Sequence, residues 1–191
     1  MQQHVNQTCR NCHYYLRQIG RIRPYLTEFA CKNAIQSLVI SRLDGCNAIL
    51  NGISVSQLNR LQVIQNKAAR VIARINPREH ITPVLRELHW LPVRSRIAYK
   101  TVMYVFKCLR GFGPAYMRDL LQLYERPRGM RTLQRGPILK VPRVKSSFGE
   151  RSFMYAAAKT WNSLPVEVRE ADSLPTFKRL LKTCYFRLEF Y

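Results

Sequence analysis

The sequence predicts a mainly α-helical protein, and three observations support this fold class. Apolar residues recur at spacings of three and four along most of the 191-residue chain, which is typical of helices with one buried face. Ser, Thr or Pro stands where most of these segments begin, as expected at helix N-termini. Hydrophobic residues make up 47% of the chain, which is too many for a disordered basic tail and enough for a buried core.

Residues 1–52 are predicted to form a first helical segment. A helix over residues 8–23 would have one apolar and one basic face. Its basic face would carry Arg10, Arg17 and Arg21. Pro24 ends this helix, and Thr27 is placed to cap a second helix over residues 28–43.

Residues 53–124 are predicted as a second domain, which contains the clearest amphipathic helix of the chain. Ser54 or Ser56 can cap this helix, which continues to Ile75 with an aliphatic stripe on one side. No acidic residue occurs between residues 57 and 78. The cations of this helix are Arg60, Lys67, Arg70 and Arg74, three of which recur every seven residues.

Three further helices are predicted within the same domain. Thr82 and Pro83 begin a short helix, residues 94–109 form a longer one, and Pro114 begins a helix over residues 115–123. The basic face of the longer helix carries Arg96, Lys100 and Lys107.

Residues 125–151 lose the helical periodicity and combine Gly, Pro and Ser with eight Lys and Arg. They are predicted to form a basic, partly extended loop, in which residues 138–141 can form a short strand. The loop cations that we expect to bind a partner are Arg128, Arg131, Arg135, Lys140, Arg143 and Lys145. Residues 152–191 predict two C-terminal helices, the second capped by Ser173.

The formal net charge of +21 indicates an anionic partner. It is spread over segments predicted to fold, because residues 1–151 contain 26 Lys and Arg against 7 Asp and Glu. Such a chain repels itself unless something neutralises it, and arginine, which outnumbers lysine, suits bidentate phosphate recognition. We therefore expect RNA or DNA as the partner, bound through phosphates by the cations named above. The alternatives are an acidic protein or membrane surface, or a basic surface that is merely solvated.

The location that we expect is nuclear or cytoplasmic. No run of 18 apolar residues occurs, and the first residues lack the apolar stretch of a secretory signal. We therefore expect a protein that is not secreted and has no membrane partner. Four aromatic residues are able to stack on bases, but we predict them to lie in the core. They are Tyr99, Tyr104, Phe148 and Tyr155.

The cysteines and histidines give only weak signals for a metal or a haem. Cys9, Cys12 and His13 spell a haem-attachment pattern, but a zinc site would need a second ligand pair at suitable spacing. We expect Cys12 to belong to a helix seam, Cys9 to be incidental and the remaining cysteines to be small core residues. The sequence therefore predicts no metal and no cofactor.

The acidic residues argue against catalysis. A two-metal polymerase or nuclease site needs several converging carboxylates, whereas this chain has eleven acidic residues with none adjacent. No phosphate-binding glycine loop occurs, and His80 and His89 have no nucleophile in a recognisable arrangement. We therefore predict no catalytic residues and expect no enzyme activity from this chain alone.

Several motifs resemble those of a known family and follow its order. They are SRLDGCNAIL (41–50), LNRLQVIQNKAARVI (58–72), HITPVLRELHWLPVRSRIAYK (80–100), FGPAYMRDLL (112–121), KTWNSLPVEVR (159–169) and FKRLLKT (177–183). From about residue 35 to 186, the chain resembles the C-terminal region of reverse transcriptases from non-LTR, LINE-type retrotransposons of the Jockey superfamily. Residues 9–34 resemble the helical segment that follows the polymerase palm.

The resemblance implies a parent RNA-directed DNA polymerase that nicks target DNA and copies its RNA onto the exposed end. This chain would correspond to its non-catalytic tail, a thumb-like helical bundle with a C-terminal helical extension, because the catalytic aspartates have no counterpart here. Gly45 and Lys67 depart from the family pattern and suggest a decayed or truncated element copy, or a host gene derived from one.

Two other functions remain open from the sequence. The helices can form a protein-interaction module that docks to a polymerase core or a host partner and has no nucleic-acid role. A catalytic fragment would extend a primer in the presence of Mg²⁺, which we do not expect.

Overall fold

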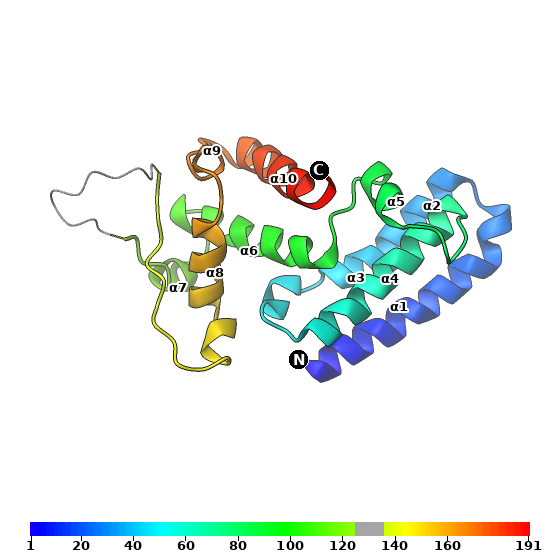
Figure 1. Ribbon diagram of the computed structural model, residues 1–191, viewed down its shortest axis with the longest axis horizontal. Helices are drawn as coiled ribbons and strands as arrows, with labels where there is room; N and C mark the ends of the chain where they lie inside the picture. Colours follow the sequence, from blue (N-terminus) through cyan, green and yellow to red (C-terminus); the bar gives the residue numbers. More distant parts are fainter. Residues whose placement is uncertain (125–135) are drawn as a thin grey trace. The chain divides into compact units, whose positions relative to one another are not determined.

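The computed structural model describes residues 1–124 and 136–191, and its regular elements are helices (Figure 1). This confirms the mainly α prediction. The chain divides into two compact units, one of residues 1–97 with 189–191 and one of residues 98–188. The boundary lies within a single helix, α6, inside the segment 53–124 that the sequence groups together. Among the described helices, none combines the length and the apolar character needed to cross a membrane.

The first unit is built on two long helices, α1 and α4. Its elements are α1 (Gln2–Ile22), η1 (Arg23–Tyr25), α2 (Glu28–Ile35), η2 (Gln36–Ile40), α3 (Ser41–Asp44), η3 (Asn47–Leu50), α4 (Val55–Ala73), α5 (Thr82–Glu87) and the start of α6 (Val93–Leu109). The predicted caps form, because Thr27 Oγ1 accepts a hydrogen bond from Ala30 N and Ser54 Oγ accepts one from Gln57 N. The predicted second helix is present from α2 through α3, with a π-helical turn, η2, in its middle.

In the first unit, the start of α1 and the end of α4 differ from the prediction. The first helix begins at Gln2 and not near residue 8, because Val5 is fully buried and extends the apolar seam by one more turn. The helix α4 ends at Ala73, since Arg74 adopts the left-handed conformation with a φ of 54°.

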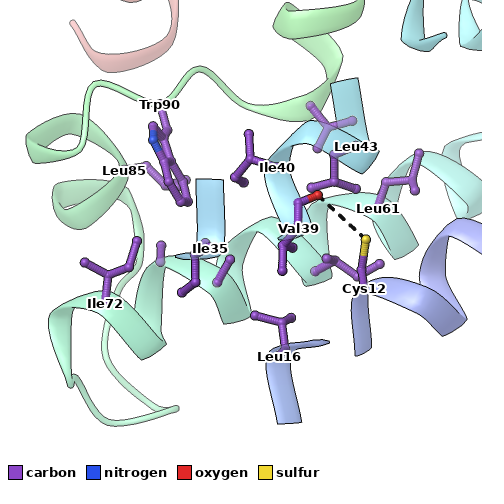
Figure 2. Close-up of a cluster of buried hydrophobic side chains, with 14 of the residues drawn as sticks. Cys12, Leu16, Ile35, Val39, Ile40, Leu43, Leu61, Ile72, Leu85 and Trp90 are labelled. Carbon is purple, nitrogen blue, oxygen red and sulfur yellow. Dashed lines mark hydrogen bonds between the residues drawn. The ribbon is translucent and has the colours of Figure 1, made fainter. Parts of the chain in front are cut away.

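The core of the first unit lies between α1, the helix from α2 to α3, α4 and the α5 segment. Figure 2 shows Cys12 and Leu16 of α1 facing Val39 of η2 and Leu61 of α4. Trp90 lies at the edge of this cluster, beside Leu85. The Cys12 thiol donates to the carbonyl of Val39 at 3.8 Å. Burial of these apolar side chains holds α1 against the return helix and α4.

The two long helices run in the same direction, as contacts near their two ends show. Near the start of both helices, Arg60 donates to the Asn6 side-chain oxygen at 2.7 Å. Near their ends, the Arg23 guanidinium donates to the carbonyls of Val71 and Ile72, each at 2.8 Å. These carbonyls belong to the last turn of α4, where the helix offers no backbone N–H to bind them. The contacts therefore fix the register of the pair, and Figure 1 shows the two helices side by side.

The second unit has its own aromatic core. Its elements are the remainder of α6, α7 (Ala115–Asp119), η4 (Gly149–Arg151), α8 (Phe153–Asn162), α9 (Val166–Arg169) and α10 (Leu174–Phe190). The rings of Phe106 and Phe177 stack with centroids 4.0 Å apart, and Trp161 lies 5.9 Å from Phe177. The Trp161 indole donates to the carbonyl of Pro137 at 2.9 Å, which ties an extended segment to α8.

The predicted short strand over residues 138–141 is wrong. Within the described residues, only Leu139 pairs there, in an isolated antiparallel bridge with Leu123. The bridge is held by Tyr124 N, which donates to the carbonyl of Ile138, and by Lys140 N, which donates to that of Gln122. On the other edge, the Asn162 side chain binds the N–H and the C=O of Leu139, at 2.9 and 2.8 Å, so a second strand cannot pair there. The predicted helix over residues 115–123 is shorter for a related reason, because Leu123 belongs to this bridge.

Candidate nucleic-acid interface

A groove runs along the parallel helices α1 and α4 of the first unit. It consists of two adjoining hollows, of about 480 and 810 Å³, which share His13 and Val63. The smaller hollow is lined by Asn6, Cys9, Arg10, His13, Arg60 and Val63. The larger one is lined by His13, Leu16, Arg17, Val63, Asn66, Lys67, Arg70, Val71, Ile75 and Pro77. We call these residues together the α1–α4 groove.

Five cations line the α1–α4 groove, and none of its lining residues is acidic. They are Arg10 and Arg17 from α1, and Arg60, Lys67 and Arg70 from α4. All except the half-buried Arg70 are exposed. Cations that converge along a groove without carboxylates favour an anionic ligand, because the ligand relieves their mutual repulsion.

The parallel register explains how these cations come together. Arg10 and Arg17 are seven residues apart on α1, and Arg60 and Lys67 are seven apart on α4. Seven residues are close to two helical turns, so each pair lies along one edge of its helix. Because the helix starts are aligned by the contact between Asn6 and Arg60, the two edges meet across the groove.

The imidazole of His13 lies where the two hollows meet, and its pKa is shifted by its surroundings there. Burial lowers its pKa, and the positive charges of Lys67 and Arg17 lower it further. His13 is therefore neutral at neutral pH, and its surroundings show that the field in the groove is positive.

Arg70 lines the larger hollow as a half-buried cation. Its Nη2 donates to the backbone carbonyl of Glu79 at 3.2 Å, which holds the guanidinium in place. Its Nε atom is buried and has no hydrogen-bond partner in the described part of the chain. Because this atom is closed to solvent, a ligand in the groove cannot reach it, and Arg70 enters the interface only as a cation.

Among the other cations predicted to bind, Arg74 and Arg96 engage the fold. Arg74 is exposed, ends α4, and donates to the carbonyl of Arg23 at 3.0 Å. Arg96 makes a two-pronged ion pair with Asp44, in which Nε lies 2.8 Å from Oδ1 and Nη2 contacts Oδ2. The Asp44 carboxylate occupies the guanidinium N–H groups with which Arg96 would bind a phosphate, so we leave Arg96 out of the interface that we propose below.

The remaining predicted cations lie outside the first unit or outside the described residues. Lys100 and Lys107 of α6 belong to the second unit, as do the exposed Lys140, Arg143 and Lys145. Lys140 and Arg143 line a hollow of about 260 Å³ there. The predictions for Arg128, Arg131 and Arg135 fall outside the described residues.

The groove residues that were not assigned to binding from the sequence include Arg10, Arg17 and His13. Arg10 and Arg17 were visible as a basic helix face, and their seven-residue spacing matches that of the α4 cations. That match is the signal from which their partnership could have been predicted. His13 gave no such signal, since its role depends on the neighbouring helix.

The structure corrects the prediction for one of the four aromatic residues. Phe148 is 82% exposed and does not lie in a core. Tyr99, Tyr104 and Tyr155 are half-buried. Lys100 and Lys159 lie over the rings of Tyr104 and Tyr155, with Nζ 5.9 and 5.6 Å from the centroids.

The thiols of Cys9 and Cys12 are buried in the seam of α1. Burial raises the pKa of Cys12 to about 11 and also raises that of Cys9, so both stay protonated near neutral pH. Within the described residues, His, Cys, Asp and Glu form no group of three that could hold a metal ion. Cys46 is exposed, so the prediction that it is a core residue is wrong.

Comparison with known protein families, curated proteins and solved structures finds no match to this chain.

Proposed function

We propose that this chain binds RNA or DNA through phosphate contacts in the α1–α4 groove, with little sequence specificity. The observation that carries the proposal is the convergence of five cations, without a lining carboxylate, in a protein of net charge +21. The ordered retrotransposon motifs give the biological setting that we propose, a non-catalytic part of a LINE-type RNA-directed DNA polymerase. A related polymerase core is then a further partner.

The chemistry of the groove suits a phosphodiester backbone. Guanidinium and ammonium groups on both edges can each take a phosphate and release its condensed counterions. Such contacts position a strand without reading its bases, so the affinity would depend strongly on salt and weakly on sequence.

Charge reversal in the groove tests this function. Arg10, Arg17 and Lys67 are exposed and make no hydrogen bond or ion pair in the described structure, so replacing each with Glu should leave the fold intact. We expect the Arg10→Glu/Arg17→Glu/Lys67→Glu variant to bind a labelled single-stranded oligonucleotide about 100-fold more weakly in a polarisation assay at fixed salt.

A matched control changes the net charge by the same amount elsewhere. Lys32, Arg86 and Arg94 are exposed residues of the first unit that do not line the groove. The Lys32→Glu/Arg86→Glu/Arg94→Glu variant should lose only the small affinity that follows from net charge. If both triple variants, with unchanged helical circular dichroism, bind equally well, the groove is not the interface.

One observation favours a second function, docking to a protein partner. Large apolar side chains are exposed on and around α7 in the second unit, including Phe112 (73%), Tyr116 (68%) and Leu123 (54%). Exposed apolar patches mark interaction surfaces in many proteins. If docking were the only function, the charge-reversed variant and its control would behave alike toward nucleic acid.

A further inference from the structure

We propose that the larger hollow of the α1–α4 groove accepts an unpaired nucleobase, so that the groove binds single-stranded nucleic acid in preference to a duplex. This inference rests on the proposed function and adds that the bound nucleic acid is single-stranded. Three features of the hollow carry it: an apolar lining, an amide donor with a fixed orientation and a neutral imidazole.

The lining of the larger hollow is more apolar than phosphate binding requires. Five of its residues are aliphatic or proline, namely Leu16, Val63, Val71, Ile75 and Pro77. Phosphates gain nothing from such a surface, whereas the flat face of a base is removed from water on it. The hollow is open and has a volume of about 810 Å³, which leaves room for one base.

Cations from both helices flank this apolar lining. Arg17 of α1 and Lys67 of α4 line this hollow from the two helices and are exposed. Arg10 and Arg60 continue the cationic lining into the adjoining smaller hollow. A nucleotide within a strand has this composition, an apolar face with anionic groups on both sides.

Asn66 lines the hollow, and a chain of amide hydrogen bonds fixes which of its side-chain atoms accepts and which is left to donate. The backbone N–H of Val93 can only donate, and it donates to Gln62 Oε1 at 2.8 Å. The Gln62 Nε2 must therefore face the other way, where it donates to Asn66 Oδ1 at 2.8 Å and to Gln65 Oε1 at 2.9 Å. At the other end of the chain, Gln65 Nε2 donates to the carbonyl of Leu91 at 2.8 Å.

This network leaves one donor available. Because Asn66 Oδ1 is used as an acceptor, its Nδ2 remains as a donor, and the described structure gives it no partner. Carbonyl and ring-nitrogen acceptors on the edge of an unpaired base match such a donor.

His13 provides a flat surface at the junction of the two hollows. Its half-buried imidazole is neutral at neutral pH and is therefore not one of the phosphate-binding cations. Imidazole rings are among the side chains on which unstacked bases pack. In a duplex the bases stay stacked and paired, so only the phosphates could use the groove and these three features would make no contact.

The test compares oligonucleotides that have the same phosphates but differ in their bases. The probes are a labelled oligothymidylate, an abasic oligomer of the same length and a duplex of the same length, titrated onto the full chain at one salt concentration. We expect oligothymidylate to bind about tenfold more tightly than the abasic strand and more tightly than the duplex.

Two variants locate the base. Asn66→Leu removes the amide donor at nearly constant volume, and His13→Ala removes the imidazole; both should weaken oligothymidylate binding about fivefold and leave abasic binding unchanged. The matched control is Asn59→Leu, which changes an exposed asparagine of the same helix outside the groove and should affect neither probe.

Equal affinity for oligothymidylate and the abasic strand, or a preference for the duplex, would overturn this inference. If oligonucleotide binding still became weaker when the groove charges were reversed, the proposed phosphate-binding function would stand and only the base-binding inference would fail. If none of the three probes bound, the proposed function itself would fail.

Discussion

At the scale of single residues, the charge of the α1–α4 groove acts on the side chains that line it. His13 lies between cations of both helices, and its pKa is lowered by burial and by the charges of Lys67 and Arg17. Arg96 shows the opposite outcome, since its guanidinium is neutralised by Asp44. Because Asp44 is 52 residues away in the sequence, the spacing of the cations alone could not separate Arg96 from the groove cations.

The lowered pKa of His13 predicts a pH dependence of stability. The folded state binds the imidazole proton less readily than the unfolded chain, so this contribution to stability is fully present above the unfolded pKa of about 6.5. It is lost as the pH falls through the lower folded pKa. We expect the free energy of unfolding to decrease between pH 7.5 and pH 5 less steeply in a His13→Gln variant than in the wild type.

Urea unfolding at several pH values measures this difference. His4 is an exposed histidine near the start of α1, and His4→Gln serves as the control. Identical pH profiles for the wild type and His13→Gln would show that the groove does not oppose protonation of His13.

At the scale of helices, one arginine joins the ends of α1 and α4. The Arg23 guanidinium donates to the carbonyls of Val71, Ile72 and Leu26, each at 2.8 Å. The neighbouring Arg21 is exposed and serves as a comparison. We expect Arg23→Ala to lower the free energy of unfolding by about 2 kcal/mol, because it leaves helix-end carbonyls without a charged donor.

The matched Arg21→Ala variant should stay within about 0.5 kcal/mol of the wild type. Urea unfolding followed by circular dichroism compares the two, and hydrogen exchange of the last turn of α4 localises the effect. Equal stability of the two variants would mean that Arg23 does not hold the helix pair together.

Most helices could be predicted because their signals are local. Thr27 and Ser54 cap helices as expected, and the seven-residue cation spacing of α4 is visible in the sequence. The features that were missed depend on distant contacts. The side chain of Asn162 binds one edge of the backbone at Leu139, and the burial of Val5 extends α1 toward its start.

At the scale of the molecule, the positive charge could be predicted but its arrangement could not. The sequence shows basic faces on both long helices. The alignment of these faces depends on the parallel pairing of α1 and α4, which is fixed by contacts between residues about fifty positions apart in the sequence. The two units each have their own core, and the groove belongs entirely to the first. The origin in a LINE-type polymerase stays a prediction that rests on the ordered motifs.

The salt dependence of binding tests the phosphate-binding groove most directly. For single strands, the slope of log K against log salt decreases by about 0.7 for each phosphate contact that is lost. We therefore predict that an Arg10→Ala/Arg17→Ala/Lys67→Ala variant binds oligothymidylate with a slope about 2 shallower than that of the wild type. A slope equal to the wild-type value would show that these side chains do not contact phosphates and would contradict the groove as the interface.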